Sequence, residues 1–535
     1  MIRRKTTKNS KNRAGNEPEK PDDVQVKEYN KKTTRFSGYV VFSLVFLLRF
    51  FNAVTTRTYF QADEFFQCLE PAHKFVYGYG YVTWEWNEKL RSAIHPFLYV
   101  LGYKFASYFN DDIVTVTIIP KVLSAAIASL GETMLYKFVY VYSNDHQLAV
   151  ISLILSLLNP FNWHVVTRSF SNCFELTLTL CAFRFWPWNA RISANYYKSL
   201  LFAIISCLVR PTNIMLWSIL GLHLLVNTPD NKLRLMAYST VLLALTLLAN
   251  LAIDFVFYKE WTFPLYNFVE FNVIKSLSIF YGVAPWHFYI FQAVPLMLMT
   301  YLPFFLHGLL RNHNNVLVVA SSVVLLGFSS IAHKEFRFIY PLMPTFILVT
   351  AYSVQQAYRS HRSLWKKIAL VIVFVNIGVA YFFTRVNERG AIDVIDYLRD
   401  DPDVTSFGFL TPCHSTPWQS HLHDPQYENS WFLTCEPPLH LGSDIDAIKQ
   451  YKDESDIFFE NPTRFLDENF PSLRGKPSSS TKYTWPSHVV VFQPLEATMN
   501  AYFENTPYHE CNRFFNSYFH WDSRRSGDII VYCSR

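Results

Sequence analysis

The segment LMAYSTVLLALTLLANLAI, residues 235–253, contains no Asp, Glu, Lys or Arg over nearly the length that a helix needs to cross a bilayer. Three further segments share this property: NHNNVLVVASSVVLLGFSSIA (312–332), FIYPLMPTFILVTAYSVQQAY (338–358) and IALVIVFVNIGVAYFFT (368–384). None of them shows the apolar stripe of a helix that packs on a soluble core. Because such segments recur, the sequence predicts an α-helical polytopic membrane protein.

We expect about eleven transmembrane helices. Their predicted limits are 37–54, 116–141, 147–167, 172–188, 197–209, 214–228, 234–257, 286–310, 314–332, 338–357 and 367–384. The segment 93–109 is predicted either as a further span or as a helix in the membrane interface. Eleven spans that start in the cytosol place the C-terminus on the opposite, luminal side. The loops that share this side are 55–92, 168–171, 258–285 and 333–337.

Charge is concentrated near the N-terminus. Residues 1–35 contain 11 Lys and Arg against 5 Asp and Glu, an excess of +6 that equals the formal net charge of the whole chain. A basic segment before an apolar helix is typical of a cytosolic anchor, so we expect a cytosolic tail at 1–36 and no nucleic-acid binding. The following apolar stretch lacks a small-residue cleavage site and is therefore predicted as a retained first span.

The composition changes at about residue 385. We therefore predict a membrane domain at 37–384 and a luminal domain of mixed α/β structure at 385–535, with strand-like runs HVVVFQ and GDIIVYC. This domain holds four of the eight cysteines, Cys413, Cys435, Cys511 and Cys533. An even number of cysteines in an oxidising lumen predicts two disulfides, with three possible pairings. Zinc binding is the weaker alternative because no CxxC spacing is present.

Polar residues suited to chemistry gather on the predicted luminal side. Asp63 and Glu64 follow the first span, and cations stand on the other luminal loops at Arg168, Arg210, His333, Lys334 and Arg337. A carboxylate facing several cations suits the transfer of a group from a lipid phosphate, with the carboxylate as general base. The alternative is that these charges only reach the lipid headgroups and set the topology.

HKEFRFIYP (333–341) resembles the signature of glycosyltransferase family 22, the endoplasmic-reticulum (ER) mannosyltransferases that use dolichyl-phosphate mannose. Three other segments resemble family motifs and occur in the family's order: ADEFFQCLEPAHKFVYGYGYVTWEW (62–86), LRSAIHP (90–96) and TRSFSNCFE (167–175). The similarity covers roughly residues 40 to 380. Several separate motifs make a chance match between unrelated sequences improbable.

Within the family, CHSTPWQSHLH (413–423), followed by the cysteine of FLTCEPP, resembles the branch that adds the third mannose to the glycosylphosphatidylinositol (GPI) precursor. Ala62 stands where this branch is expected to have proline. The resemblance implies a GT-C fold, an ER membrane location, an α1,2 linkage and a luminal active site that inverts the sugar. It implies dolichyl-phosphate mannose and a mannosylated GPI lipid as substrates, among ER membrane lipids. The need for a partner subunit is left open.

The resemblance also implies roles for individual residues. Asp63 is expected to be the general base, with Glu64 as its helper or as the alternative base. The donor phosphate is expected to contact His333, Lys334, Arg337 and Arg168, with Glu335 orienting a cation. Substrate contacts are expected at His73, Trp84, Trp86 and Arg210, although these aromatic side chains equally suit anchoring in the interface. No cofactor or metal is expected, because lysine and arginine can stabilise the phosphate charge.

Three alternative functions remain. A sister mannosyltransferase, acting on lipid-linked oligosaccharide or adding the fourth GPI mannose, would share HKEFRF and the acidic loop. A transporter would place charge at mid-bilayer and often has repeated halves, whereas here the charge lies at one edge and no repeat is visible. A noncatalytic scaffold would tolerate the loss of Asp63.

Overall fold

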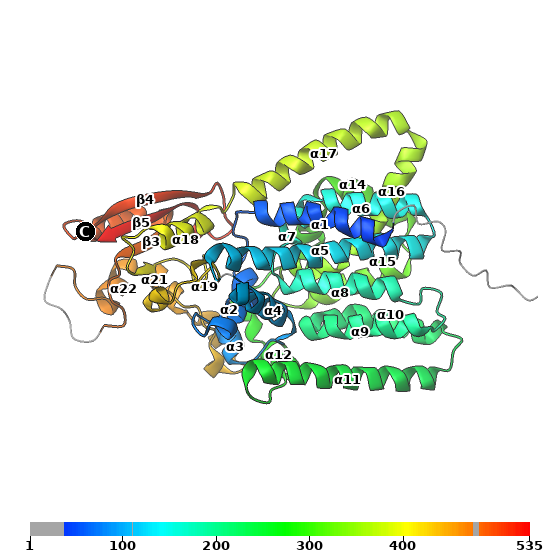
Figure 1. Ribbon diagram of the computed structural model, residues 1–535, viewed down its shortest axis with the longest axis horizontal. Helices are drawn as coiled ribbons and strands as arrows, with labels where there is room; N and C mark the ends of the chain where they lie inside the picture. Colours follow the sequence, from blue (N-terminus) through cyan, green and yellow to red (C-terminus); the bar gives the residue numbers. More distant parts are fainter. Residues whose placement is uncertain (1–36, 110, 475–480, 535) are drawn as a thin grey trace, which may run out of the picture. The chain divides into compact units, whose positions relative to one another are not determined.

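Helices dominate residues 38–385, and a small sheet follows them (Figure 1). The computed structural model of the protein describes residues 37–109, 111–474 and 481–534. The predicted cytosolic tail at 1–36 lies outside these residues. Gly38–Arg535 forms one compact unit.

The membrane helices follow the predicted spans. Each of the eleven predicted segments contains helix, with limits that differ by a few residues. In chain order these helices are α1 (Gly38–Thr55), α5 (Ile113–Ser143), α6 (His146–Leu158), α7 (Pro160–Val165), α8 (Ser171–Phe185), α9 (Ala194–Val209), α10 (Ile214–Asn227), α11 (Lys232–Tyr258), α13 (Val294–Leu298), α14 (Leu302–Arg311), α15 (Val316–Ser330), α16 (Met343–Ser360) and α17 (Arg362–Arg385).

The surface of these helices is strongly apolar. α17 exposes Leu370, Phe374 and Ile377, and α11 exposes Leu245 and Leu248. Apolar area of this extent is unfavourable in water but is compatible with lipid. Within the described residues, six helical stretches are long and apolar enough to cross a membrane: Gly38–Thr55, Ile113–Ser143, Lys232–Tyr258, Tyr289–Arg311, Phe336–Ser360 and Arg362–Asp400. The predicted polytopic membrane fold is confirmed, and the count of eleven spans stays a prediction.

The predicted span 147–167 is broken in two at Asn159 and Pro160. The Asn159 side chain caps α7 by accepting a hydrogen bond from the backbone N–H of Asn162 at 2.7 Å. Pro160 occupies the first helical position, where its missing N–H costs no hydrogen bond. The short helix α7 then leads the chain toward Arg168.

An ion pair joins α1 to α5 inside the helical part. Arg49 and Glu132 are almost fully buried, and Arg49 Nε donates to Glu132 Oε2 at 2.8 Å. Ser156 and Asn162 also donate to Glu132, at 3.1 and 3.0 Å. A charge pair at this depth is stable only when its remaining hydrogen-bonding capacity is satisfied. The pair therefore fixes how α1 packs beside α5 and, with it, where the following loop begins.

The loop after α1 folds into short helices beside α4 (Ile94–Phe109). They are the π-helix η1 (Phe65–Leu69), α2 (Glu70–Tyr77) and α3 (Trp84–Asn87). The start of α4 is fixed by the Ala93 N–H, which donates to Asp254 at the end of α11 at 2.7 Å. Beyond its other end, Asp111 lies 3.3 Å from His423 of the C-terminal domain. Both ends of α4 are thus on one side, which supports the interfacial alternative for 93–109.

The C-terminal part is built on a mixed five-stranded sheet with strand order β2-β1-β3-β5-β4. Strand β1 (Phe407–Phe409) runs parallel to β2 (Trp431–Phe432) and β3 (His488–Phe492), whereas β5 (Gly527–Ser534) is antiparallel to β3 and β4 (Tyr508–Ser517). The helices of this part are α18 (Gly390–Asp400), α19 (Gln419–Leu422), α20 (Ile445–Gln450), α21 (Glu454–Glu460), α22 (Pro462–Asn469) and α23 (Glu496–Phe503). The predicted mixed α/β character is confirmed.

The loop after α1 and the C-terminal sheet share one hydrophobic core. Phe66 of the loop lies beside His414, with ring centroids 4.2 Å apart, and Trp418 packs edge-on against Phe432 at 4.8 Å. The Tyr59 hydroxyl donates to the His414 carbonyl at 2.6 Å. The C-terminal domain therefore packs directly on the loop that carries the acidic pair.

Candidate active site

Two adjacent acids, Asp63 and Glu64, stand immediately before η1 and have different partners. Arg337 donates through Nη1 to Asp63 Oδ2. Arg168 donates through Nη1 to Glu64 Oε2 at 2.8 Å. Successive residues of a helical turn point about 100° apart, so the two carboxylates reach different surroundings. The structure thus divides the predicted charge cluster into an Asp63 side and a Glu64 side.

On the Asp63 side, Arg337 is held between two carboxylates. Its Nε and Nη2 donate to the two oxygens of Glu335 at 2.6 and 2.8 Å, while Nη1 reaches Asp63. His333 Nε2 lies 3.2 Å from Glu335, and its Nδ1 lies 3.0 Å from the Gly282 carbonyl. Burial raises the pKa of Glu335, but Arg337 and His333 lower it more, so the pKa lies well below its usual range. Glu335 therefore orients Arg337, as the sequence predicts.

Arg91 and Arg210 also belong to the Asp63 side. Arg91 donates to Glu85 at 2.6 and 3.1 Å, and the charges of Asp63 and Arg337 act on both Arg91 and Arg210. The Arg210 guanidinium lies 5.5 Å from the centre of the Phe338 ring, and that of Arg337 lies 6.0 Å from the same ring. Three arginines thus gather near Asp63. Arg91 was not predicted as a site residue, although it lies in the quoted motif LRSAIHP.

Lys334 points away from this cluster. Its ammonium group donates to the Ala284 carbonyl at 2.8 Å and to the Ile331 carbonyl. These bonds, with the contact between His333 and Gly282, attach the segment around residue 334 to the preceding loop. Lys334 therefore binds backbone carbonyls of its own segment and of the preceding loop, and the structure does not bring this cation to Asp63.

On the Glu64 side, Arg168 is fully engaged with the protein. Its Nε donates to the His164 carbonyl at 2.8 Å, and its two terminal nitrogens donate to the Thr58 carbonyl and hydroxyl at 2.8 and 2.9 Å, besides Glu64. The remaining N–H faces His164 Nδ1 at 3.4 Å. Burial raises the pKa of Glu64 although Arg168 opposes it. Arg168 hence holds Glu64 in place and has no donor left for the phosphate that the sequence predicts it to bind.

The aromatic residues predicted to contact substrate are packed against other protein side chains and backbone. His73 is fully buried, and its Nε2 lies 2.9 Å from Nδ1 of His423. Trp86 donates through its indole N–H to the Phe66 carbonyl at 3.0 Å, and Trp84 packs on Phe271 with ring centres 5.0 Å apart. Burial lowers the pKa of His73 to about 3, so this side chain is neutral. These packing contacts give His73, Trp84 and Trp86 a structural role. Contact of these side chains with a sugar stays a prediction.

Glu70 connects the acidic loop to the segment 413–423. Its carboxylate accepts hydrogen bonds from the backbone N–H of Trp418 at 2.9 Å, from the N–H of Ser420 at 3.2 Å and from the Ser420 hydroxyl at 2.6 Å. Burial raises the pKa of Glu70 to about 7, although these hydrogen bonds oppose the rise. Glu70 was not predicted as a functional residue, because nothing in the sequence pairs it with a segment 350 residues away.

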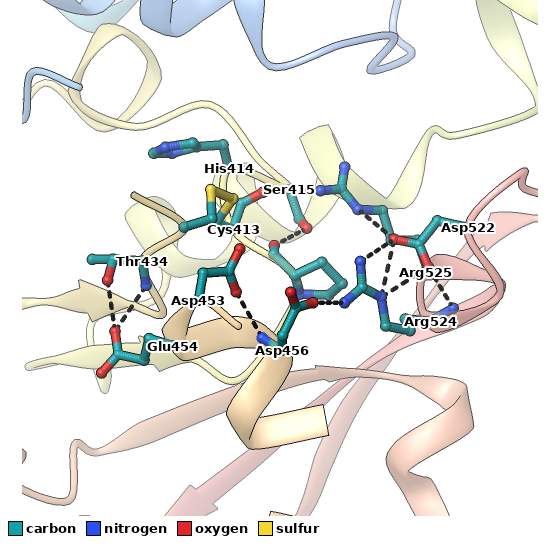
Figure 2. Close-up of a disulfide and its surroundings, with 12 residues drawn as sticks. Cys413, His414, Ser415, Thr434, Asp453, Glu454, Asp456, Asp522, Arg524 and Arg525 are labelled. Carbon is teal, nitrogen blue, oxygen red and sulfur yellow. Dashed lines mark hydrogen bonds and ion pairs between the residues drawn. A yellow bond between two sulfur atoms is a disulfide. The ribbon is translucent and has the colours of Figure 1, made fainter. Parts of the chain in front are cut away.

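The four cysteines of the C-terminal domain form two disulfides, Cys413–Cys435 and Cys511–Cys533. This is one of the three pairings that the sequence leaves open. Figure 2 shows the first disulfide, with Arg524 between Asp522 and Asp456 close by. Arg525 donates to the Cys413 carbonyl at 2.9 Å. The disulfide and these charges fix the segment that packs on the acidic loop.

The weaker zinc alternative involves the same cysteines. Cys413, His414 and Cys435 have potential ligand atoms within 4.8 Å of one another, as do His488, Cys511 and Cys533. A sulfur in a disulfide is not the thiolate that zinc requires. The disulfides of the structure thus do not fit a zinc ion at either place.

A cavity of about 340 Å³ lies beside Glu64 and Arg168. Its wall combines the end of α1, the first turns of α5, helix α18 and the segment that carries α19. Besides Arg168, three cationic side chains line it: Arg57 just after α1, Lys121 of α5 and Arg399 of α18. None of these three was predicted as a site residue, since they stand apart in the sequence and belong to no motif.

The architecture resembles that of GT-C glycosyltransferases. A crystal structure of ArnT from Cupriavidus metallidurans bound to undecaprenyl phosphate matches with a TM-score of 0.56 and 12% identity, over 92% of this chain and 97% of that one. The apo structure of the same enzyme matches with a TM-score of 0.50. The predicted GT-C fold is confirmed.

Sequence comparison defines the family. The profile of the Alg9-like mannosyltransferase family matches residues 40–423, and the chain belongs to this family. The GPI mannosyltransferase 3 of Debaryomyces hansenii is 50% identical over 96% of this chain and 95% of its own. The proteins of the same name from Candida albicans and Saccharomyces cerevisiae are 52% and 35% identical, over 94% and 92% of this chain and 99% and 95% of their own. The predicted resemblance is confirmed: the chain is a mannosyltransferase of GPI-anchor synthesis.

Proposed function

We propose that the chain transfers mannose from dolichyl-phosphate mannose, in α1,2 linkage, to the second mannose of the GPI precursor. The main support is the contact between Asp63 and Arg337, which brings a candidate base and a candidate phosphate ligand together in one site. In the proposed reaction the donor sugar separates this pair and lies between the two side chains. The names of the relatives support the acceptor, since all three are GPI mannosyltransferase 3. The donor and the linkage rest on the family resemblance.

In the proposed reaction Asp63 removes the proton from the acceptor hydroxyl. The oxygen of that hydroxyl bonds to the anomeric carbon while the bond from this carbon to the phosphate oxygen breaks, and dolichyl phosphate leaves. One displacement converts a β-linked mannosyl phosphate into an α-mannoside, so base and leaving group stand on opposite faces of the sugar. General base catalysis of this kind contributes roughly 100- to 10,000-fold.

The arginines of the Asp63 side supply positive charge that stabilises the negative charge on the leaving phosphate. The donor phosphodiester carries one negative charge, and a second develops on it as the sugar leaves. Arg337 can offer two parallel N–H groups to phosphate oxygens, and Arg91 and Arg210 lie near enough for their charges to act on the same site. These cations take the role that a metal ion has in other transferases, so the proposed reaction needs no metal.

The remaining charged residues of the site support or supplement Asp63 and Arg337 in the proposed reaction. His333 and Lys334 hold the segment that orients Arg337 through Glu335 and the loop carbonyls. Glu64, held by Arg168, is the alternative base. We propose that the acidic loop and the C-terminal domain face the ER lumen and that the N-terminus is cytosolic. The two disulfides support this side, because the lumen is oxidising.

The test uses the purified chain in lipid with dolichyl-phosphate mannose and a two-mannose GPI acceptor. We expect a three-mannose product whose new residue is released by an α1,2-specific mannosidase. Transfer to lipid-linked oligosaccharide, or to a three-mannose GPI acceptor in preference to the two-mannose one, would assign the chain to a sister activity instead.

A further inference from the structure

The cavity beside Glu64 carries more positive than negative charge. Four cations line it, Arg57, Lys121, Arg168 and Arg399, against the two carboxylates of Glu64 and Asp396. Burial lowers the pKa of the fifth basic group in its wall, His421, to about 3, so this imidazole adds no charge. The cavity therefore has an excess of two positive charges in a space of about 340 Å³.

Two of these cations are available to a ligand. Arg168 is bonded to Glu64 and to its own neighbours, and Arg399 donates to Asp396 at 2.9 Å and to Asp400 at 2.7 and 3.0 Å. Within the part of the chain that the structure describes, the side chains of Arg57 and Lys121 have neither an ion pair nor a hydrogen bond. Lys121 nevertheless stands in the field of Glu64 and Asp396. Cations gathered without a partner in a cavity are suited to bind an anion.

The volume and composition of the cavity suit a polar group on a larger molecule. A cavity of this size is at the lower end of the range for small-ligand sites. Apolar side chains of α5, among them Val116 and Pro120, form part of its wall beside the cations. Such a lining accepts a phosphate or another compact anion whose attached sugar or chain extends outward.

The geometry of the reaction decides which substrate the anion belongs to. This step rests on the proposed function, in which the donor phosphate is held by Arg337 on the Asp63 side. A single displacement brings the acceptor hydroxyl to Asp63 on the face opposite the leaving group, so the acceptor does not share the Arg337 side of the sugar. The Glu64 side is left for the rest of the acceptor molecule. The wall of the cavity also contains Ser420 and His421 of the segment that Glu70 anchors to the acidic loop.

We propose that Arg57 and Lys121 form a second phosphate site, which binds a phosphate group of the acceptor glycolipid during mannose transfer. A GPI lipid contains the phosphodiester that joins inositol to its lipid, and a phosphoester on a sugar close to the reacting mannose would have the same chemistry. Both groups offer anionic oxygens to a guanidinium and an ammonium. The donor phosphate and the acceptor phosphate are thus recognised by separate cations on either side of the acidic pair.

The first test measures steady-state kinetics with three synthetic two-mannose acceptors. One carries only the lipid phosphodiester, one has an alkyl chain in its place, and one has the alkyl chain plus a phosphoester on the first mannose. Lys121→Gln and Arg57→Gln are each expected to raise KM for a phosphate-bearing acceptor roughly ten-fold. KM for the phosphate-free acceptor and for the donor should stay unchanged. The phosphate-bearing acceptor that loses affinity identifies the source of the phosphate.

Exposed cations on the predicted cytosolic side that form no ion pair among the described residues provide matched controls. Lys367→Gln and Arg311→Gln should leave all three acceptor KM values unchanged. A loss in Lys121→Gln that persists with the phosphate-free acceptor overturns the inference, because a merely structural role would act on every acceptor. A rise in KM for dolichyl-phosphate mannose also overturns it and assigns the cavity to the donor.

A binding measurement keeps the inference separate from the proposed function. The full chain in detergent is titrated with dihexanoyl phosphatidylinositol, with mannose 6-phosphate and with dihexanoylglycerol as the phosphate-free control. If one phosphate probe binds and Lys121→Gln weakens this binding, the second phosphate site is supported. This conclusion holds even if no mannose transfer is detected, because a lack of transfer would refute only the proposed function. Binding of neither phosphate probe, or binding that Lys121→Gln leaves unchanged, overturns the second phosphate site.

Discussion

Replacing Arg337 by lysine tests the proposed donor site while keeping its charge. Arg337 donates three hydrogen bonds to two carboxylates, two of them to Glu335 and one to Asp63. A lysine ammonium is a single point charge on a flexible stem and cannot present two parallel N–H groups to a phosphate while it also contacts Glu335. Arg337→Lys therefore loses about two charge-assisted hydrogen bonds, each worth roughly 1.5–3 kcal/mol.

If about 3 kcal/mol of this stabilisation is realised in the transition state, kcat/KM falls roughly 100-fold. The assay measures kcat/KM for dolichyl-phosphate mannose, with Arg311→Lys as the control on an exposed arginine. Glu335→Gln should lower kcat/KM as well, and the double variant should be little worse than Arg337→Lys, because Glu335 acts through Arg337. A kcat/KM for Arg337→Lys within three-fold of the wild-type value would refute the role of the guanidinium.

Three further predictions concern stability. Arg49→Met should lower the free energy of unfolding by about 3–5 kcal/mol, because it leaves Glu132 charged and unpaired, and adding Glu132→Gln should restore most of the loss in a thermal denaturation assay. Burial raises the folded-state pKa of Glu70 from 4.5 to about 7. The protonated carboxyl therefore stabilises the folded state fully below pH 4.5, and this stabilisation is lost as the pH rises to 7. Glu70→Gln should remove this pH dependence, which is measured as a smaller difference in Tm between pH 5 and pH 8. Replacing Cys413 and Cys435 by serine opens a loop of 22 residues and should cost about 3 kcal/mol, while a reductant should no longer lower the Tm through this disulfide.

Much of the helical architecture could be predicted from hydropathy, because lipid requires long apolar segments whatever their neighbours are. The break at Asn159 and Pro160 was missed, since it lies inside an apolar stretch and only the capping side chain distinguishes it. The buried pair of Arg49 and Glu132 was missed for a similar reason. A window average dilutes one charge, and nothing in the sequence shows that two charges 83 residues apart meet.

The sequence indicates which segments form the candidate site better than it indicates how their side chains are arranged. HKEFRFIYP and the acidic loop indicate which segments matter, and the structure brings Asp63, Arg337 and Glu335 together. Lys334, however, donates to backbone carbonyls, and every N–H group of the Arg168 side chain is hydrogen-bonded to the protein. The direction of a side chain depends on local backbone geometry and on neighbours distant in sequence, so the presence of a cation in a motif does not determine what it contacts.

The measurement that tests the central claim most directly compares Asp63→Asn with Glu64→Gln in the purified protein. Both variants are first shown to keep the wild-type Tm, and turnover is then measured with saturating dolichyl-phosphate mannose and the two-mannose GPI acceptor. Because Asp63 is proposed as the base, Asp63→Asn should lose roughly 100- to 10,000-fold in kcat, whereas Glu64→Gln should keep most of it. A folded Asp63→Asn variant with near wild-type kcat, together with an inactive Glu64→Gln, would contradict the assignment and make Glu64 the base.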